Sequence, residues 1–94
     1  MKICYLDFWP GFDPSNNWFN LVFRDVFPEE RLNFLASPES ADIILASSFG
    51  SSRFKYTNSK AIKIFYTGEN ERAEFAFADY TLSFDFDTHG GKNF

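Results

Sequence analysis

The sequence predicts a small α/β fold: a single Rossmann-like domain with a mostly parallel sheet. Short apolar runs rich in β-branched and aromatic residues recur along the chain, and one amphipathic helical pattern lies between the first two runs. In residues 41–49, "ADIILASSF", the uninterrupted "IILA" is typical of a strand that is buried on both faces of a parallel sheet. A chain of 94 residues with 14 phenylalanines has the size and apolar bulk of one domain.

The first apolar run, residues 2–9, predicts a strand that ends at a turn. The turn is expected in "PGFDP", residues 10–14, because proline fixes φ and glycine adopts φ values that other residues avoid. A helix is then expected over residues 14–27. Asp13 or Ser15 could cap its free amides, and Pro28 cannot continue it.

Apolar residues at helical spacing form a stripe on this expected helix, and the stripe should pack on the sheet. Its members are Trp18, Phe19, Val22, Phe23 and Val26. Asn20, Arg24 and Asp25 are expected to face away from the sheet.

Further strands are expected over residues 31–36, 41–49, 61–67 and 79–86, with the run 41–49 in a central position. Residues 50–60 are polar and predict a loop that could contain one helical turn. Ligands of such sheets gather in loops beyond the carboxyl ends of the strands. Three loops are therefore candidate sites: residues 10–15, 49–53 and 68–72.

Composition excludes several classes of partner. The net charge of −4, with the nine Lys and Arg scattered, argues against a nucleic-acid or anionic-membrane surface. No apolar run approaches the about 18 residues of a membrane span. Cys4 is alone in an apolar run, so it is expected to pack as a small hydrophobe in a reducing compartment. We therefore expect a cytoplasmic protein.

Two blocks of sequence carry a family resemblance. The stretch "FYTGENE", residues 65–71, is followed by "FADYTLSFD", residues 77–85. Together they resemble the N-terminal half of bacterial α-1,3-fucosyltransferases, the Lewis-antigen-forming enzymes, whose pattern is Phe-Tyr-Thr-Gly-Glu-Asn and then Asp-Tyr-Ala-hydrophobic-Gly-Phe-Asp. The chain departs from that pattern at Thr81 and Ser83, and at Ala73, where a proline is usual.

The resemblance implies a GT-B arrangement of two Rossmann-like halves. Residues 1–94 would be the half that faces the acceptor sugar, and the half that binds GDP-fucose is absent from them. In the full-length family, fucose passes with inversion from GDP-fucose to an N-acetylglucosamine-containing glycan. Residues 1–94 are expected to be inactive alone, because no group in them is assigned to hold the leaving diphosphate.

By the same resemblance, Glu69 is the general base that removes a proton from the acceptor hydroxyl. Trp9, Gly68, Asn70 and Glu71 are the expected acceptor-binding residues. Without the resemblance, a Glu after a strand-end glycine is most often a solvated loop residue or a helix cap. Trp9 could likewise be a core residue rather than a stacking partner for a sugar ring.

Other candidate sites are weaker in the sequence. "FGSSR", residues 49–53, could hold an anion with free amides, but an ordinary turn with a Ser cap is favoured because the multiple glycines of a phosphate loop are missing. His89 lies in the tail, and no ligand spacing for a metal is recognised.

A different class of function also remains open: a non-catalytic α/β binding or dimerisation module. The aromatic inventory could exceed what one small core hides, so that surplus rings form a homodimer contact. The rings considered for that contact are Phe75, Phe77, Phe86 and Phe94.

Overall fold

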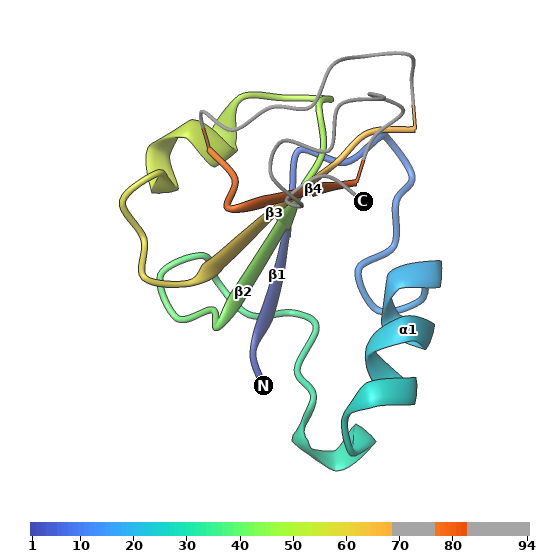
Figure 1. Cartoon of the computed structure of the whole chain (residues 1–94). Helices are drawn as coiled ribbons and strands as arrows, with labels where there is room; N and C mark the ends of the chain where they lie inside the picture. Colours follow the sequence, from blue (N-terminus) through green and yellow to red (C-terminus); the bar gives the residue numbers. More distant parts are fainter. Residues whose placement is uncertain (69–76, 83–94) are drawn as a thin grey trace.

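A four-stranded, all-parallel sheet forms the centre of the computed structural model, which describes residues 1–68 and 77–82. The strands are β1 (Ile3–Leu6), β2 (Ile43–Ala46), β3 (Ile62–Tyr66) and β4 (Tyr80–Leu82), in the order β1-β2-β3-β4 (Figure 1). The helix α1 (Trp18–Val26) follows β1, and two 3-10 helices, η1 (Glu29–Arg31) and η2 (Ser52–Tyr56), lie in later connections. The expected parallel α/β class is confirmed.

Strand β2 is central, as its sequence predicts. It pairs with β1 on one side and β3 on the other, and all four of its residues are buried. Continuous apolar residues suit such a strand because both faces of a parallel sheet are covered. Cys4 is also in the core, 4% exposed, as expected of a small hydrophobe.

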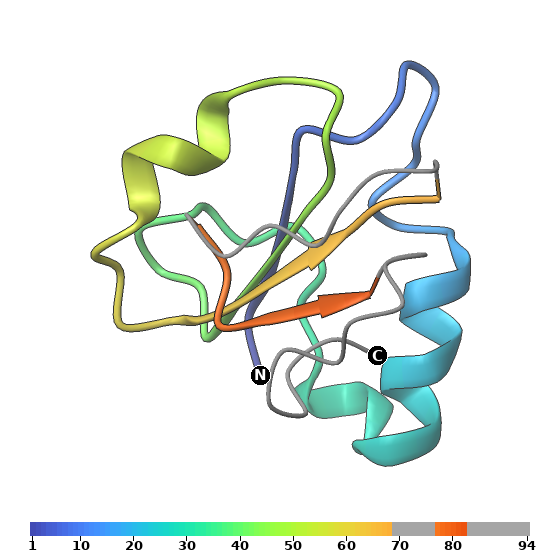
Figure 2. The same ribbon diagram turned by 45° about the horizontal axis from the view of Figure 1, so that its top comes forward.

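The two faces of the sheet are covered by different segments. α1 lies on one face and η2 on the other (Figures 1 and 2). On the α1 face, Ile3, Phe34 and Ile43 form a small core with Phe23 against it. On the η2 face, the larger core contains Ile44 and Phe65, with Tyr56 of η2 packed against it.

The strand expected over residues 31–36 is wrong for most of its length. Arg31 still belongs to η1, and Asn33 alone forms an isolated parallel bridge, with Lys2. The side chain of Asn33 then accepts a hydrogen bond from the amide of Leu35 at 2.9 Å. Such a local bond competes with strand pairing. Counting this bridge as the second strand, the chain follows the order 2-1-3-4-5 of flavodoxin-like sheets, whose ligands bind between the first and third strands.

The helix starts later than expected and has a different cap. Asn17, rather than Asp13 or Ser15, caps α1 through a bond from the amide of Asn20. Asp13 instead accepts bonds from the amide and hydroxyl of Ser15, and these bonds lower the pKa of its carboxyl. Because residues 13–16 form this turn, the helix begins only at Trp18.

The predicted division of the helix into an apolar and a polar face is partly wrong. Phe19 is buried, but Trp18, which borders a hollow between the helix and the sheet, is 64% exposed, and Val26 is 67% exposed. Asn20, expected to face away, is fully buried. Its amide nitrogen donates to the carbonyl of Pro14 and its side-chain oxygen accepts from the hydroxyl of Tyr5, so both polar atoms of the buried side chain have a partner.

Candidate functional site

Two of the three expected site loops come together at the carboxyl ends of β1 and β2. The connections from these strands lead to opposite faces, one to α1 and the other to η2 (Figure 2). The two loops run side by side, because Leu6 accepts a hydrogen bond from the amide of Ser47 at 3.0 Å and Asp7 accepts one from the amide of Phe49 at 2.9 Å. This is the position at which flavodoxin-like sheets bind ligands.

Asp7 turns the chain directly after β1. Its φ of 59° lies in the left-handed region, which Asp and Asn enter more readily than most residues. Its carboxylate accepts hydrogen bonds from the amides of Ser52 at 3.0 Å and Arg53 at 2.9 Å. The close packing leaves room only for a glycine at position 50, since a Cβ there would lie 2.7 Å from Oδ1 of Asp7.

Arg53 completes this arrangement as a buried cation. Its guanidinium lies 3.1 Å from the Asp7 carboxylate and also donates to the carbonyl of Gly50. The side chains of Arg53 and Asp7 are only 6% and 4% exposed. The guanidinium also stacks over the rings of Phe54 and Phe65. The Asp7–Arg53 pair therefore fastens the loop after β2 to the end of β1.

Aromatic rings cover the outside of the same loops. Phe8 stacks on Phe12 with ring centroids 4.2 Å apart, and Trp9 packs edge-on against both. Trp9 also contacts Phe49 of the other loop at 6.1 Å. Trp9 is 39% and Phe49 50% exposed, so both rings present surface to solvent.

Tyr5, whose ring contacts Phe8 and Phe12, has a hydroxyl that takes part in a hydrogen-bond network. The hydroxyl of Tyr5 donates to the side-chain oxygen of Asn20, and Asn17 lies 3.5 Å from it. Burial raises the pKa of the Tyr5 hydroxyl, so it stays protonated and remains a donor. The network joins β1, the loop and the start of α1.

The third expected loop begins at the carboxyl end of β3. Gly68 is exposed there, and a Cβ at this position would lie 2.9 Å from the hydroxyl oxygen of Tyr66. The ring of Tyr66 packs against Phe19, which connects this strand end with α1. The structure thus places Gly68 and Trp9 at the same end of the sheet. Glu69, Asn70 and Glu71 lie outside the described residues.

Asp79, an acid of the second block of the resemblance, lies at the opposite end of the sheet, where it has a structural role. Asp79 precedes β4, where its carboxylate accepts from the amide of Lys63 at 3.0 Å and lies 3.5 Å from the Lys63 ammonium. That ammonium is buried and donates to the carbonyls of Ser59 and Ala61. Asp79 therefore ties β4 to β3.

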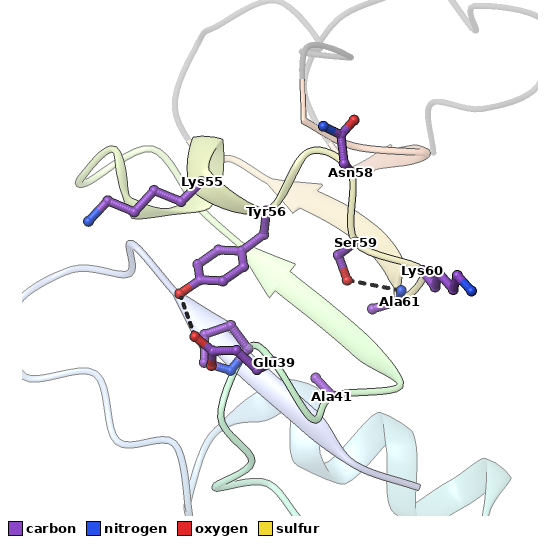
Figure 3. A pocket seen from close by; sticks show the side chains of 9 residues that line it. Glu39, Ala41, Lys55, Tyr56, Asn58, Ser59, Lys60 and Ala61 are labelled. Atoms are coloured by element: carbon purple, nitrogen blue, oxygen red, sulfur yellow. Dashed lines mark hydrogen bonds between the residues drawn. The ribbon is translucent and has the colours of Figure 1, made fainter.

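A hollow of about 480 Å³ also lies at the amino ends of β2 and β3, beside η2. Figure 3 shows Tyr56 directed toward Glu39 across it, with Lys55 and Lys60 pointing outward on opposite sides. The Tyr56 hydroxyl donates to Glu39 at 3.2 Å. None of the expected site residues lines this hollow.

A second hollow, of about 340 Å³, is apolar and lies between α1 and the sheet. Trp18, Val22 and Phe23 line it from the helix, and Leu45, Ile64 and Leu82 line it from the strands. Trp18 was expected in the buried stripe, yet it borders this hollow and is largely exposed.

Asp7 was not expected at the site, and Phe49 and Arg53 were expected only as parts of the candidate loop 49–53, without roles of their own. Residues 49–53 were considered in the sequence as a turn that could bind an anion with its free amides. In the structure, the amide of Ser52 in this turn does bond an anion, the carboxylate of Asp7, which lies 45 residues away in the sequence. The expected Ser cap is wrong, because Ser51 makes no capping bond with its side chain. Sequence gives no signal that joins residues so far apart.

The described part of the chain contains neither a group of metal ligands nor a helix that could span a membrane. Within residues 1–68 and 77–82, no group of three His, Cys, Asp or Glu side chains could hold a metal ion. No helix there is both long and apolar enough to cross a membrane. His89 lies outside these residues.

The fold is that of a small, Rossmann-like α/β domain with an all-parallel sheet, and aromatic loops cover the carboxyl ends of its first two strands. Residues 3–94 match the family model of the alpha-(1,3)-fucosyltransferase FucT N-terminal domain, and the chain belongs to this family. It is 38% identical over 47 residues to an alpha-(1,3)-fucosyltransferase FucT of Helicobacter pylori. That match covers 50% of this chain and 10% of the relative. No solved structure matches the chain.

Proposed function

We propose that residues 1–94 are the acceptor-side domain of an α-1,3-fucosyltransferase. The reaction would carry fucose with inversion from GDP-fucose to an N-acetylglucosamine-containing glycan. The observation that carries this proposal is the match of residues 3–94 to the FucT N-terminal domain family. The exposed aromatic surface at the carboxyl end of the sheet supports it, since sugar rings stack their C–H faces on aromatic planes.

Trp9 is the acceptor-stacking residue in this proposal. Trp9 is 39% exposed, and its ring packs edge-on against Phe8 and Phe12. A ring that is already fixed loses little freedom when a sugar binds, so more of the contact energy appears as affinity. Gly68 contributes backbone at the same end of the sheet, and Asn70 and Glu71 would provide polar contacts.

Glu69 is the general base in this proposal. It follows Gly68 directly in the sequence, after the carboxyl end of β3. Its carboxylate would take the proton from the acceptor hydroxyl as that oxygen bonds to the anomeric carbon of fucose and GDP leaves. A positioned base of this kind contributes about 10² to 10⁴ in rate. One base is sufficient for inversion, whereas retaining hydrolysis needs a second, paired carboxylate.

Residues 1–94 alone would bind the acceptor without transferring fucose. Transfer of fucose requires strong electrostatic stabilisation of the leaving diphosphate. By the resemblance to the fucosyltransferases, the other half of the enzyme would provide it. Incubation of the chain with GDP-fucose and N-acetyllactosamine should therefore yield no fucosylated product. Product that disappears in Glu69→Gln would overturn this part of the proposal.

Acceptor binding is tested by nuclear magnetic resonance titration with N-acetyllactosamine. We expect shifts of the Trp9 indole and the Gly68 amide, and loss of binding in Trp9→Ala. Leu35→Ala is the matched control, because Leu35 is 69% exposed and outside the aromatic cluster. Failure of the unchanged chain to bind the sugar, or equal binding by Trp9→Ala, would contradict the proposal.

The role of Glu69 is tested in a polypeptide that joins this domain to a donor-binding half. Glu69→Gln should lower kcat by about 10² to 10⁴ with little change in KM for the acceptor. Glu71→Gln, at an expected acceptor contact, should instead raise KM. A Glu69→Gln enzyme with unchanged kcat would remove Glu69 from the chemistry.

Self-association is a second candidate function, favoured by exposed apolar side chains on α1 and just after it. Leu21, Val26 and Leu35 are each more than half exposed. The rings first considered for a dimer contact do not supply this surface: Phe77 is 3% exposed, and Phe75, Phe86 and Phe94 lie outside the described residues. Light scattering at increasing concentration tests the idea. A mass that stays at 10.9 kDa would eliminate the dimer.

A further inference from the structure

We propose that Phe49 is a second sugar-contacting ring and that Asp7 is the positioning residue that holds it beside Trp9. This inference rests on the proposed acceptor-binding function and adds two residues to it. Phe49 and Trp9 come from different strand-end loops, 40 positions apart in the sequence. Only the fold brings their rings together.

The two rings form a corner that opens to solvent. Their centroids are 6.1 Å apart and their planes meet at 76°. With 50% of Phe49 and 39% of Trp9 exposed, a sugar stacked on one ring is bordered by the other. A corner of this kind favours a pyranose with an extended apolar C–H face over a ligand that is polar on both sides.

Asp7 fastens the loop of Phe49 at Phe49 itself and at two residues that follow it. Its backbone carbonyl accepts the amide of Phe49 itself at 2.9 Å. Its carboxylate accepts the amides of Ser52 and Arg53, which follow Phe49 by three and four residues. The left-handed conformation of Asp7 belongs to this arrangement, and strain of that kind occurs where the surroundings hold a residue in one geometry.

Arg53 makes the arrangement rigid. Its guanidinium pairs with the Asp7 carboxylate at 3.1 Å and donates to the carbonyl of Gly50 within the same loop. Both charged groups are almost completely buried, so solvent screens their attraction little. Removing the charge of Asp7 should therefore make the position of the Phe49 side chain less fixed, without deleting that side chain.

The test is a double-mutant cycle on the affinity of the whole chain for N-acetyllactosamine. Asp7→Asn keeps the volume and suits the left-handed backbone but removes the charge. Phe49→Ala and Asp7→Asn should each weaken binding by about 5- to 10-fold. If Asp7 acts through Phe49, Asp7→Asn should weaken binding no further in the Phe49→Ala background.

Controls separate this positioning role from a general loss of structure. Asp42→Asn also removes a carboxylate that accepts a backbone amide, that of Lys2 at 2.7 Å, but at the amino end of the sheet. It should leave the sugar affinity unchanged. Should Asp7→Asn fail to fold, Gly50→Ala displaces the same loop, because its Cβ would collide with the Asp7 carboxylate.

The outcomes distinguish the two proposals. Binding that needs Trp9 but is unaffected by Phe49→Ala overturns this inference and leaves the proposed function standing. If the double variant loses affinity by the product of the two single losses, Asp7→Asn and Phe49→Ala act independently, and the positioning role of Asp7 is overturned. Absence of binding by the unchanged chain contradicts the proposed function and, with it, the sugar-contacting role of Phe49.

Discussion

Charged groups at the two ends of the sheet are held in different ways. At the carboxyl end, the Asp7–Arg53 pair is about 95% buried and joins two loops. At the amino end, the Lys63 ammonium is buried but its partner Asp79 is 49% exposed, and Tyr56 meets Glu39 across an open hollow. Solvent weakens the second kind of interaction much more than the first. The carboxyl end is thus the more firmly held of the two, as the proposed acceptor site requires.

The largest difference between the two ends is expected from removal of the buried cation. Arg53→Met should lower the free energy of unfolding by about 3 to 5 kcal/mol, because it leaves the Asp7 carboxylate buried without its partner. Arg24→Met is the control: Arg24 is one third exposed and its partner Glu29 is 73% exposed, so loss of this ion pair should cost about 0 to 1 kcal/mol. Urea unfolding measures both. Equal effects would show that the buried pair contributes no more than a surface pair.

A pH-dependent effect is expected next in size, from Cys4 beneath the amino-end hollow. Burial, with a smaller contribution from the Glu39 charge, raises the pKa of its thiol from 9.0 to about 11. The protonated thiol is favoured in the folded state, so this stability is complete below pH 9 and is lost as pH rises toward 11. The loss should reach about 2 to 3 kcal/mol.

Urea unfolding between pH 7 and pH 11 measures this loss. Cys4→Ala removes the thiol and should flatten the dependence between pH 9 and 10. The Tyr5 hydroxyl, whose pKa burial also raises, contributes in the same direction above pH 10 in both proteins. A Cys4→Ala protein with the same pH dependence as the unchanged chain would assign the effect to other groups.

A smaller effect is expected from crowding at the carboxyl end. Gly50→Ala should cost about 1 to 2 kcal/mol, because the added Cβ forces the Asp7 carboxylate to move. Ser51→Ala is the neighbouring control, since the Ser51 side chain is exposed and makes no capping bond. Thermal unfolding of the two variants gives the comparison. A Gly50→Ala protein as stable as Ser51→Ala would show that the loop yields without cost.

The smallest effect is expected at the open hollow. Tyr56→Phe removes the hydrogen bond to Glu39 and should change the free energy of unfolding by less than about 1 kcal/mol. Asn20→Ala is a matched contrast near the carboxyl end, where the amide side chain is fully buried; its loss should cost about 1 to 3 kcal/mol. If both variants lost equal stability, the two ends would not differ as described.

The sequence predicts the sheet well because its strands are short runs rich in apolar, β-branched and aromatic residues. The central position of residues 43–46 follows from their unbroken apolar character, and no local group competes with pairing there. Side chains that bond to nearby backbone explain the misses. The side chain of Asn33 bonds to the backbone within the strand expected over residues 31–36, and Asn17 rather than Asp13 or Ser15 caps the helix. The hydrophobic pattern of the sequence does not show which polar side chains will bond to nearby backbone groups.

The candidate site was only partly accessible from the sequence. Trp9 and Gly68 were expected at the carboxyl end of the sheet, and the described structure has both there. Phe49 lay inside an expected site loop, but its exposure beside Trp9 depends on how two distant loops meet. Asp7 and Arg53 are ordinary charges in the sequence, and only the fold makes them partners.

The bonds of Asp7 also bear on which substrate this strand-end edge can accept. Turn amides such as those of Ser52 and Arg53 are the groups with which many Rossmann-like domains hold a phosphate. Here a carboxylate of the chain itself already fills that position, with the adjacent arginine neutralised by it. A diphosphate would have to displace an internal anion, whereas an uncharged sugar meets no such competition.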